Sequence, residues 1–296
     1  MNEQVRQIAD AVLYEGYILW PYTRSATKNA QRWTFGGVYP PRRSAEHPDD
    51  RDEIRCECLL EGDGDVDVTV RFLQIVRRDP VQDGQRVDEI TVDGERHLAW
   101  DEAVERELTP GPFAIAGGVA EEPLGAGAAI VRSWESLAGT IEVRRDGLCV
   151  AVRVANETPW DGGDRDDALR RTFCSTHVVL RAERGAFVSL TDPPERHAEA
   201  AAACDNVGLW PVLVGDERTL LAAPIILSDY PQIAPESPGD LFDATEIDRM
   251  LILNVMSLTP EEQDEMRATD PRAREILDRC AALSREELLR LHGVMR

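Results

Sequence analysis

The chain has 296 residues, of which 43% are hydrophobic and 30% are charged. This length suits one large domain or two modest ones with a real core, and the apolar fraction excludes a fully disordered chain. The 55 acidic and 33 basic residues give a formal net charge of −22, which argues against binding to nucleic acid and against docking on an anionic membrane surface. No apolar run approaches the roughly 20 residues of a membrane span. Residues 1–10 lack the basic and apolar stretches of a secretory signal, so we expect a cytoplasmic protein.

Residues 1–43 form an aromatic and basic segment, which we call the head. Its first part predicts a short helix, because hydrophobic residues recur there at helical spacing: Val5, Ile8, Ala9, Val12 and Leu13. The ring-rich sequence YEGYILWPY follows at residues 14–22. Residues 44–52 are a polar, turn-rich connector. We therefore predict that residues 1–52, the aromatic and basic head with its connector, form one unit that packs on the body of the protein.

Residues 53–240 are predicted to form an antiparallel β body, which could divide into two sheet subdomains. Val66, Val68 and Val70 alternate with polar residues, which is the period of a half-buried strand. Residues 141–146 and 149–154 flank the turn at Gly147 and predict a hairpin. A further pair of strands is expected at residues 172–181 and 187–190, on either side of the turn Glu183-Arg184-Gly185.

Three segments of the body interrupt this strand pattern. Residues 100–108 predict a helix, and residues 197–204 are rich in alanine and predict one or two helical turns. The glycine-containing residues 111–127 are expected to form a loop between strands. Long strands joined by short turns favour antiparallel sheets packed as a sandwich or an open barrel.

Residues 241–296 are predicted to form a tail of short helices. Thr245 can cap the first of them. Thr259 is followed by Pro260 and by Glu262 three residues on, which is typical of a helix start. Asp270 before a proline repeats the start signal, and residues 284–287 are another capping box. The predicted fold class is therefore α+β, mainly antiparallel β, with a sandwich-like or open-barrel sheet core between an N-terminal aromatic segment and this helical tail.

Six cysteines lie in a chain that we expect to be cytoplasmic, so reduced thiols are the default. Cys56 and Cys58 lie two residues apart, which in a strand places both on one face. This pair can supply half of a tetrahedral metal site, but two further ligands are needed. We expect the cysteines to be small buried hydrophobic residues, and we predict no metal and no cofactor.

The head is the best candidate for a binding site. Residues 11–43 hold five basic residues and one acidic residue, a local balance of +4 that leaves −26 for the rest of the chain. Aromatic rings beside arginines are the residues that dominate interface energies. An outward-facing head would recognise an acidic or phosphorylated partner. The alternative is that these rings form the core of the first domain and that the cations pair internally. The candidate binding residues are Tyr17, Trp20, Tyr22, Arg24, Lys28, Asn29, Arg32 and Trp33, together with Tyr230 and Glu236 in the proline-containing segment of residues 229–240.

No complete catalytic motif is present, so no catalytic residue is predicted. The five histidines show neither an HExxH motif nor a nucleophile elbow, and His177 beside two valines is expected to be an ordinary strand residue. Gly125 and Gly127 lack the third glycine of a dinucleotide-binding turn. The aspartates of residues 161–167 do not complete a calcium loop and predict a solvated acidic loop.

Two stretches carry a resemblance to a known family. The head reads YEGYILWPYTRSATKNAQRWTFGGVYP, and residues 222–248 read AAPIILSDYPQIAPESPGDLFDATEID. Both resemble an uncharacterised actinobacterial family whose genes accompany those of nickel–iron hydrogenases and their maturation factors. The likeness extends through DPRAREILDRC to the final LHG. The resemblance implies accessory work in hydrogenase assembly, with a hydrogenase subunit or maturation factor as the partner, and it supplies no catalytic residues.

Three hypotheses follow from the sequence. The leading one is a non-enzymatic accessory or scaffold protein that binds a protein partner through the head and the proline-containing segment. The second is an enzyme or metal-handling protein whose site joins Cys56, Cys58 and a distant histidine. The third is an anion-binding module centred on Arg24, Lys28 and Arg32.

Overall fold

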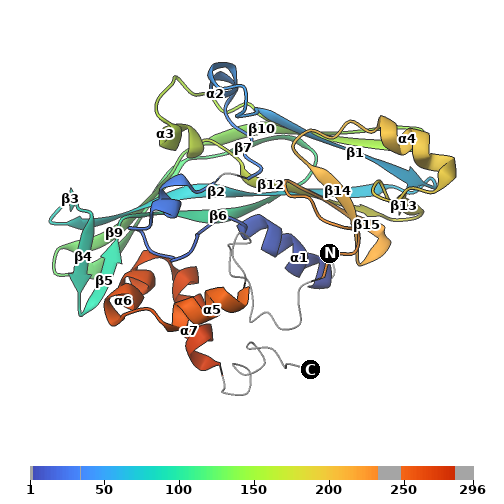
Figure 1. Cartoon of the computed structure of the whole chain (residues 1–296). Coiled ribbons are helices and arrows are strands. Elements are labelled where there is room, and N and C mark those ends of the chain that lie inside the picture. The colour runs from blue at the N-terminus through green and yellow to red at the C-terminus, as the bar shows by residue number, and fades with distance from the viewer. Residues whose placement is uncertain (1–2, 34, 233–247, 284–296) are drawn as a thin grey trace, which may run out of the picture.

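Two antiparallel sheets lie face to face and carry helices at their ends and on one outer face (Figure 1). The structure, a computed structural model, describes residues 3–33, 35–232 and 248–283. The smaller sheet has the strand order β13 (Ala186–Val188), β1 (Glu53–Glu61), β11 (Cys149–Asn156), β10 (Leu137–Asp146) and β7 (Gly111–Ile115).

The larger sheet is built around the 17-residue strand β2 (Val66–Gln82). One edge of β2 pairs with β12 (Cys174–Ala182) and then with β9 (Ala128–Trp134), and the opposite edge pairs with β6 (Trp100–Leu108) and β3 (Gln85–Arg86). A separate hairpin joins β4 (Glu89–Val92) to β5 (Glu95–Leu98). The main path of the larger sheet is β14 (Trp210–Val214), β15 (Asp216–Ala223), β12 (Cys174–Ala182), β2, β9 (Ala128–Trp134) and β8 (Gly118–Gly125).

The hydrophobic core between the sheets follows from the alternation along the strands. Residues at every second position of β2 point into the space between the sheets, where they meet the inward residues of the smaller sheet. Phe72 of β2 stacks on Phe173, with their ring centroids 4.7 Å apart. This core includes Cys56, Cys58, Val70, Ile141, Val152 and Leu180.

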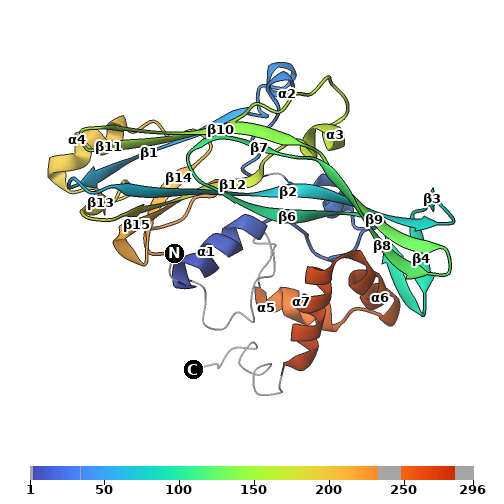
Figure 2. The ribbon, with the colours of Figure 1, turned by 180° about the vertical axis from the view of Figure 1, so that it is seen from behind.

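Helix α1 (Glu3–Tyr14) covers the outer face of the larger sheet (Figure 2). Its buried residues Val5 and Ile8 pack in one cluster with Val212 and other outward residues of β12, β14 and β15. An ion pair also fixes this helix, because Asp10 lies 2.6 Å from the guanidinium of Arg71, whose side chain is almost fully buried on β2. The sandwich therefore has a third, helical layer on one side.

The remaining helices are short. The head contains η1 (Thr27–Gln31), and α2 (Pro41–Glu46) spans the end of the head and the start of the connector. Between strands lie α3 (Arg165–Leu169), η2 (Glu195–His197) and α4 (Ala198–Ala203). The C-terminal helices α5 (Asp248–Met256), α6 (Pro260–Thr269) and α7 (Pro271–Ala282) lie on the same side of the larger sheet as α1 (Figure 1). Among the described residues, no helix combines the length and hydropathy that crossing a membrane requires.

The structure confirms the predicted fold class as an α+β sandwich rather than a closed barrel. It confirms the first helix, the hairpin of β10 and β11, and the helical turns at η2 and α4. The starts of α6 and α7 are also confirmed, with Thr259 and Asp270 as their N-caps. Thr245 and the capping box at residues 284–287 lie outside the described residues. The division at residues 52 and 240 stays a prediction.

Three predictions about local structure are wrong. Residues 100–108 form strand β6 instead of a helix, because they pair with β2 from Val70 to Arg78. Residues 111–127 hold β7 and β8 instead of a single loop. The strands at residues 172–181 and 187–190 are not partners, since β12 pairs with β2 and β15 whereas β13 pairs with β1 of the other sheet.

Two valines give a matched test of the sandwich core. Val152 is fully buried in β11, whereas Val119 on the edge strand β8 is 70% exposed. We expect Val152→Ala to lower the free energy of unfolding by about 2 kcal/mol, because it removes buried methyl groups and leaves a cavity. Val119→Ala should change it by less than about 0.5 kcal/mol. Urea denaturation measures both, and equal losses would contradict the placement of these strands.

Buried His177 predicts a dependence of stability on pH. Its ring lies in the folded protein beside Arg71, its Nε2 atom has no described partner, and burial together with Arg71 lowers its pKa from 6.5 to about 3. Between these two values the unfolded chain binds a proton that the folded chain does not bind. The free energy of unfolding should therefore fall as the pH is lowered from about 6.5 towards 3.

Urea denaturation at pH 7, 6, 5 and 4 checks this expectation with His177→Gln, which should show a shallower loss in acid than the wild type. The exposed His47→Gln variant serves as the control and should follow the wild type. The same slope for all three proteins would show that His177 is not buried in a neutral state.

Candidate functional site: a cavity under the head

The aromatic residues of the head lie mostly inside the protein. Tyr17, Tyr22 and Trp33 are buried, and Trp20 packs half-buried against the same hydrophobic cluster. The expectation of an outward-facing set of rings is therefore wrong for these residues. The physical reason is that α5 and α7 bring Leu251, Ile276 and neighbouring apolar residues onto the rings.

The polar candidates of the head divide into two groups. Asn29 is buried and fixes the local loop, since its side chain accepts from Leu19 N and donates to the carbonyls of Leu19 and Thr23. Arg32 is only 5% exposed. Arg24 and Lys28 are exposed. Tyr230 is 44% exposed and donates its backbone N–H to Leu213 of β14, whereas Glu236 lies outside the described residues.

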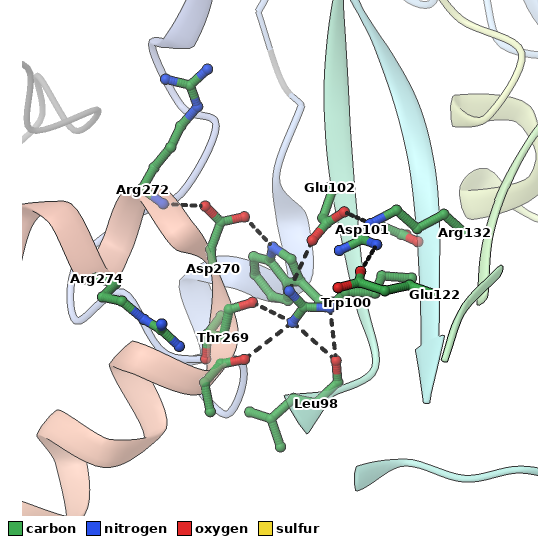
Figure 3. A network of polar contacts seen from close by, with 12 residues as sticks. Leu98, Trp100, Asp101, Glu102, Glu122, Arg132, Thr269, Asp270, Arg272 and Arg274 are labelled. Carbon is green, nitrogen blue, oxygen red and sulfur yellow. Dashed lines mark hydrogen bonds and ion pairs between the residues drawn. The ribbon is translucent and has the colours of Figure 1, made fainter. Parts of the chain in front are cut away.

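One carboxylate ties the head to the sheet and to the helical tail. Asp270 is 1% exposed, and its Oδ2 accepts hydrogen bonds from Tyr17 Oη at 2.6 Å and from Trp100 Nε1 at 2.9 Å. Its Oδ1 accepts from Arg272 N at 2.8 Å, so the same residue caps α7. Figure 3 shows Asp270 between the indole of Trp100 and Arg272. We call Tyr17, Trp100 and Asp270 the Asp270 junction.

Arg78 makes a second connection between the sheet and the tail. Its guanidinium donates to the carbonyl oxygens of Ala268 and Thr269 at the end of α6, as well as to Leu98 O. A cation near the last carbonyls of a helix is favourable. Arg78 also forms an ion pair of 2.9 Å with Glu102 on β6. All of its nitrogen atoms are thus engaged inside the protein.

Arg32 lies flat against the rings of the head. Its guanidinium carbon is 3.6 Å from the centroid of the Trp100 ring and 4.9 Å from that of Trp33. The guanidinium donates to Tyr17 O at 3.0 Å and to Asp101 O at 2.8 Å. Stacking on aromatic faces together with two carbonyl acceptors stabilises a buried arginine. Arg32 therefore acts as a wall of the site rather than a free cation.

A cavity of about 360 Å³, which we call the head cavity, opens where the head crosses the start of β6. Four of the residues that the sequence singled out line it together: Arg24, Asn29, Arg32 and Trp33. Tyr17, Trp20, Tyr22, Lys28 and Tyr230 do not line it. The other lining residues are Ala30, Ile75, Arg77, Arg78, Asp79, Asp88, Ala99, Trp100, Asp101, Arg165, Asp166, Leu169 and Arg170.

The lining carries six arginines and four aspartates, which is a formal balance of +2 in a chain of −22. Arg77 Nε donates to both carboxylate oxygens of Asp79, at 2.8 and 2.9 Å. Arg165 donates one N–H to Arg32 O at 2.9 Å. The Nε atom of Arg170 is buried and has no hydrogen-bond partner among the described residues. The cavity therefore offers unused guanidinium donors.

Asp101 is the carboxylate that faces these donors. No hydrogen bond or ion pair engages its carboxylate oxygens within the part of the chain that the structure describes. Burial raises the pKa of the Asp101 carboxyl above its usual value, and the positive charges of Arg170, Arg32 and Arg77 act in the opposite direction. The carboxylate of Asp101 is thus near several cations without direct contact with any of them, although the backbone carbonyl of Asp101 accepts from Arg32.

The ionisable side chains of the lining are arginines and aspartates. Guanidinium groups recognise carboxylate and phosphate oxygens, often with two parallel hydrogen bonds. The arrangement is suited to holding an anionic group.

The cysteines do not form a second site of this kind. Cys56 and Cys58 are buried in the sandwich core on one face of β1, as the sequence predicted. Cys58 is hydrogen-bonded to Cys56 and buried, and both effects raise its thiol pKa. No three His, Cys, Asp or Glu side chains gather as metal ligands within residues 3–33, 35–232 and 248–283. The second hypothesis therefore gains no support from these residues.

Sequence reasoning missed four important residues of the cavity: Arg77, Asp101, Arg165 and Arg170. Asp101 lies in the segment predicted as a helix, and Arg165 lies in the segment predicted as an acidic loop. Arg170 directly follows α3. No local pattern marks these residues, because only the pairing of β6 with β2 and the position of α3 bring them together.

Comparisons of the chain with models of protein families and with curated proteins gave no significant match.

The Asp270 junction is tested by removing one hydroxyl. Tyr17→Phe should lower the free energy of unfolding by on the order of 1–3 kcal/mol, because a buried carboxylate loses a hydrogen-bond donor. The control is Tyr230→Phe, which makes the same change at an exposed ring and should cost less than about 0.5 kcal/mol. Urea denaturation of both variants gives the comparison, and a Tyr17→Phe variant as stable as the wild type would contradict the junction.

Proposed function

We propose that this chain is a non-enzymatic accessory protein of the cytoplasm that binds an acidic group of a protein partner in the head cavity. The resemblance of its head and of residues 222–248 to hydrogenase-associated proteins supplies the context. In that context the partner is a subunit or a maturation factor of a nickel–iron hydrogenase.

The main support for the proposal is that arginine side chains in the head cavity have N–H groups that make no hydrogen bond among the described residues, although the protein as a whole is acidic. A chain of −22 repels an acidic partner at long range, so specific binding of such a partner requires short-range contacts with exposed or cavity-lining cations. Arg165 and Arg170 can provide such contacts in the head cavity.

The rigidity of the site supports binding rather than catalysis. Asn29, Arg32 and Arg78 are held by several internal hydrogen bonds each, so the wall of the cavity is preorganised. A preformed wall reduces the entropy lost on binding. The lining supplies guanidinium donors and two carboxylates without a hydrogen-bond partner among the described residues, Asp101 and Asp166, and this set can position an acidic group.

The structure also changes which of the candidate binding residues we expect to contact a partner. The rings of the head act indirectly, since they hold Arg32 and close the hydrophobic cluster behind the cavity. Lys28 is exposed on η1 and does not line the cavity. A partner that enters the cavity therefore depends on Arg170 more than on Lys28.

Affinity purification of the tagged chain from its native host tests the proposal. We expect a hydrogenase subunit or maturation factor to co-purify with the wild type and to be lost with Arg170→Glu, because the reversed charge repels an acidic group. Two control variants should retain the partner: Lys28→Glu, outside the cavity, and Arg144→Glu, on β10 with an 80% exposed side chain.

Thermal unfolding of each variant must show that Arg170→Glu is folded. If it is not, Arg170→Gln replaces it, because this variant removes the charge without adding a like charge beside Asp101. Recovery of the wild type as a monomer without any partner, even after cross-linking, would contradict the proposal. Retention of the partner by a folded Arg170 variant would contradict the role of the head cavity.

A further inference from the structure

Asp101 and Arg77 leave the sheet on the same side. The register of β2 and β6 pairs Arg77 directly with Asp101. Directly opposed residues of neighbouring strands lie on the same face and close to one another. Arg77 is held by Asp79, whereas the carboxylate oxygens of Asp101 have no hydrogen-bond partner among the described residues. The cavity therefore contains a fixed cation and a free carboxylate side by side.

Arg165 and Arg170 face this pair from a different element. Arg165 is the first residue of α3, and Arg170 follows its last residue. Arg165 uses one N–H group on Arg32 O, and no hydrogen bond of the Arg170 guanidinium is found among the described residues, so the remaining accessible N–H groups of both arginines are available to oxygen acceptors. Asp101 and Asp166 are the two carboxylates of the lining whose oxygens have no hydrogen bond or ion pair among the described residues, and neither lies within ion-pair distance of these arginines. A ligand placed between Asp101 and the arginines would satisfy both sides.

The carboxylate restricts which anion fits. A fully ionised oxyanion such as sulfate offers only acceptor oxygens, so it would face Asp101 with two like charges and no hydrogen. An anion that carries a proton can donate it to Asp101 while its other oxygens accept from the arginines. Inorganic phosphate keeps one proton at neutral pH, because its third ionisation lies far above that pH. A phosphate monoester has a second ionisation at a pKa of about 6, so a minority of its molecules carry the proton at neutral pH and can bind in that form.

We propose that the head cavity binds a protonated tetrahedral oxyanion, either inorganic phosphate or a phosphate monoester. Arg77, Arg165 and Arg170 hold the ionised oxygens, and Asp101 accepts the hydrogen bond from the P–OH group. This inference rests on the proposed function only in using the same cavity, and it names the chemistry of the acidic group. The cavity of about 360 Å³ has room for a phosphate group and part of the molecule to which it is attached.

Isothermal titration calorimetry of the full chain with four ligands tests the inference: inorganic phosphate, O-phosphoserine, sulfate and acetate. We expect at least one of the two phosphates to bind about tenfold or more tightly than sulfate and acetate, because an unmade hydrogen bond to a charged group weakens binding by at least that factor. Tighter binding of O-phosphoserine identifies a monoester as the source, and tighter binding of inorganic phosphate identifies the free ion.

Asp101→Asn tests whether the Asp101 carboxylate selects a protonated anion or whether the arginines attract any anion. The variant should lose the preference, with phosphate and sulfate binding within about threefold of each other, because an amide no longer repels sulfate. Asp49→Asn makes the same change at an exposed position outside the cavity and should retain the preference. Arg170→Gln should weaken all anions, and the thermal unfolding of each variant confirms folding.

Equal binding of phosphate and sulfate by the wild type would overturn the inference, and so would stronger binding of acetate or no binding of either phosphate. These outcomes are distinct from failure of the proposed function. A chain that prefers phosphate but captures no hydrogenase protein retains the site and loses the proposed partner. A chain that captures the partner through Arg170 without preferring phosphate retains the partner and loses the phosphate chemistry.

Discussion

The buried carboxylate of Asp270 is the interaction on which the arrangement of the site depends. The two sheets make their own core, but the rings of the head and the apolar faces of the tail can be buried only against each other and β6. Asp270 joins these three segments, since it accepts from Tyr17 in the head and Trp100 on β6, and caps α7 in the tail. Burial raises the pKa of Asp270, and the hydrogen bonds from Tyr17, Arg272 N and Trp100 oppose that effect. Loss of these donors would leave the Asp270 carboxylate buried without compensating hydrogen bonds, which destabilises the folded protein.

The position of the head cavity follows from the same junction. Trp100 meets Asp270 through its indole nitrogen and supports Arg32 on its ring face. Its neighbour Asp101 leaves β6 in the opposite direction, as successive residues of a strand do. β2 behaves in the same way, because Arg78 binds the end of α6 and Arg77 pairs with Asp79. Arg78 and Trp100 thus anchor the tail, and they line the cavity together with Arg77 and Asp101.

The sequence allowed prediction of those features that depend on local pattern. Alternation in β2, the tight turn at Gly147, and the caps Thr259 and Asp270 each reflect neighbours a few residues apart, and the structure confirms them. β6 was mistaken for a helix because its pairing with β2 is a long-range contact that its own residues do not encode. The prediction that the rings of the head face outward was wrong for the same reason, since the helices that cover these rings follow more than 200 residues later in the chain. Arg24, Asn29, Arg32 and Trp33 were chosen for their residue types, whereas Asp101 and Arg170 required the fold.

We propose that the head cavity holds an oxyanion between its arginines and Asp101, and a crystal structure of the full chain grown in phosphate, with no sulfate present, can show that ion. We expect tetrahedral density in the cavity, within hydrogen-bond distance of the guanidinium groups of Arg165 and Arg170 and of the carboxylate of Asp101. A cavity that holds only water at saturating phosphate would rule out this binding site, and so would a direct ion pair between Asp101 and Arg170 that closes the cavity.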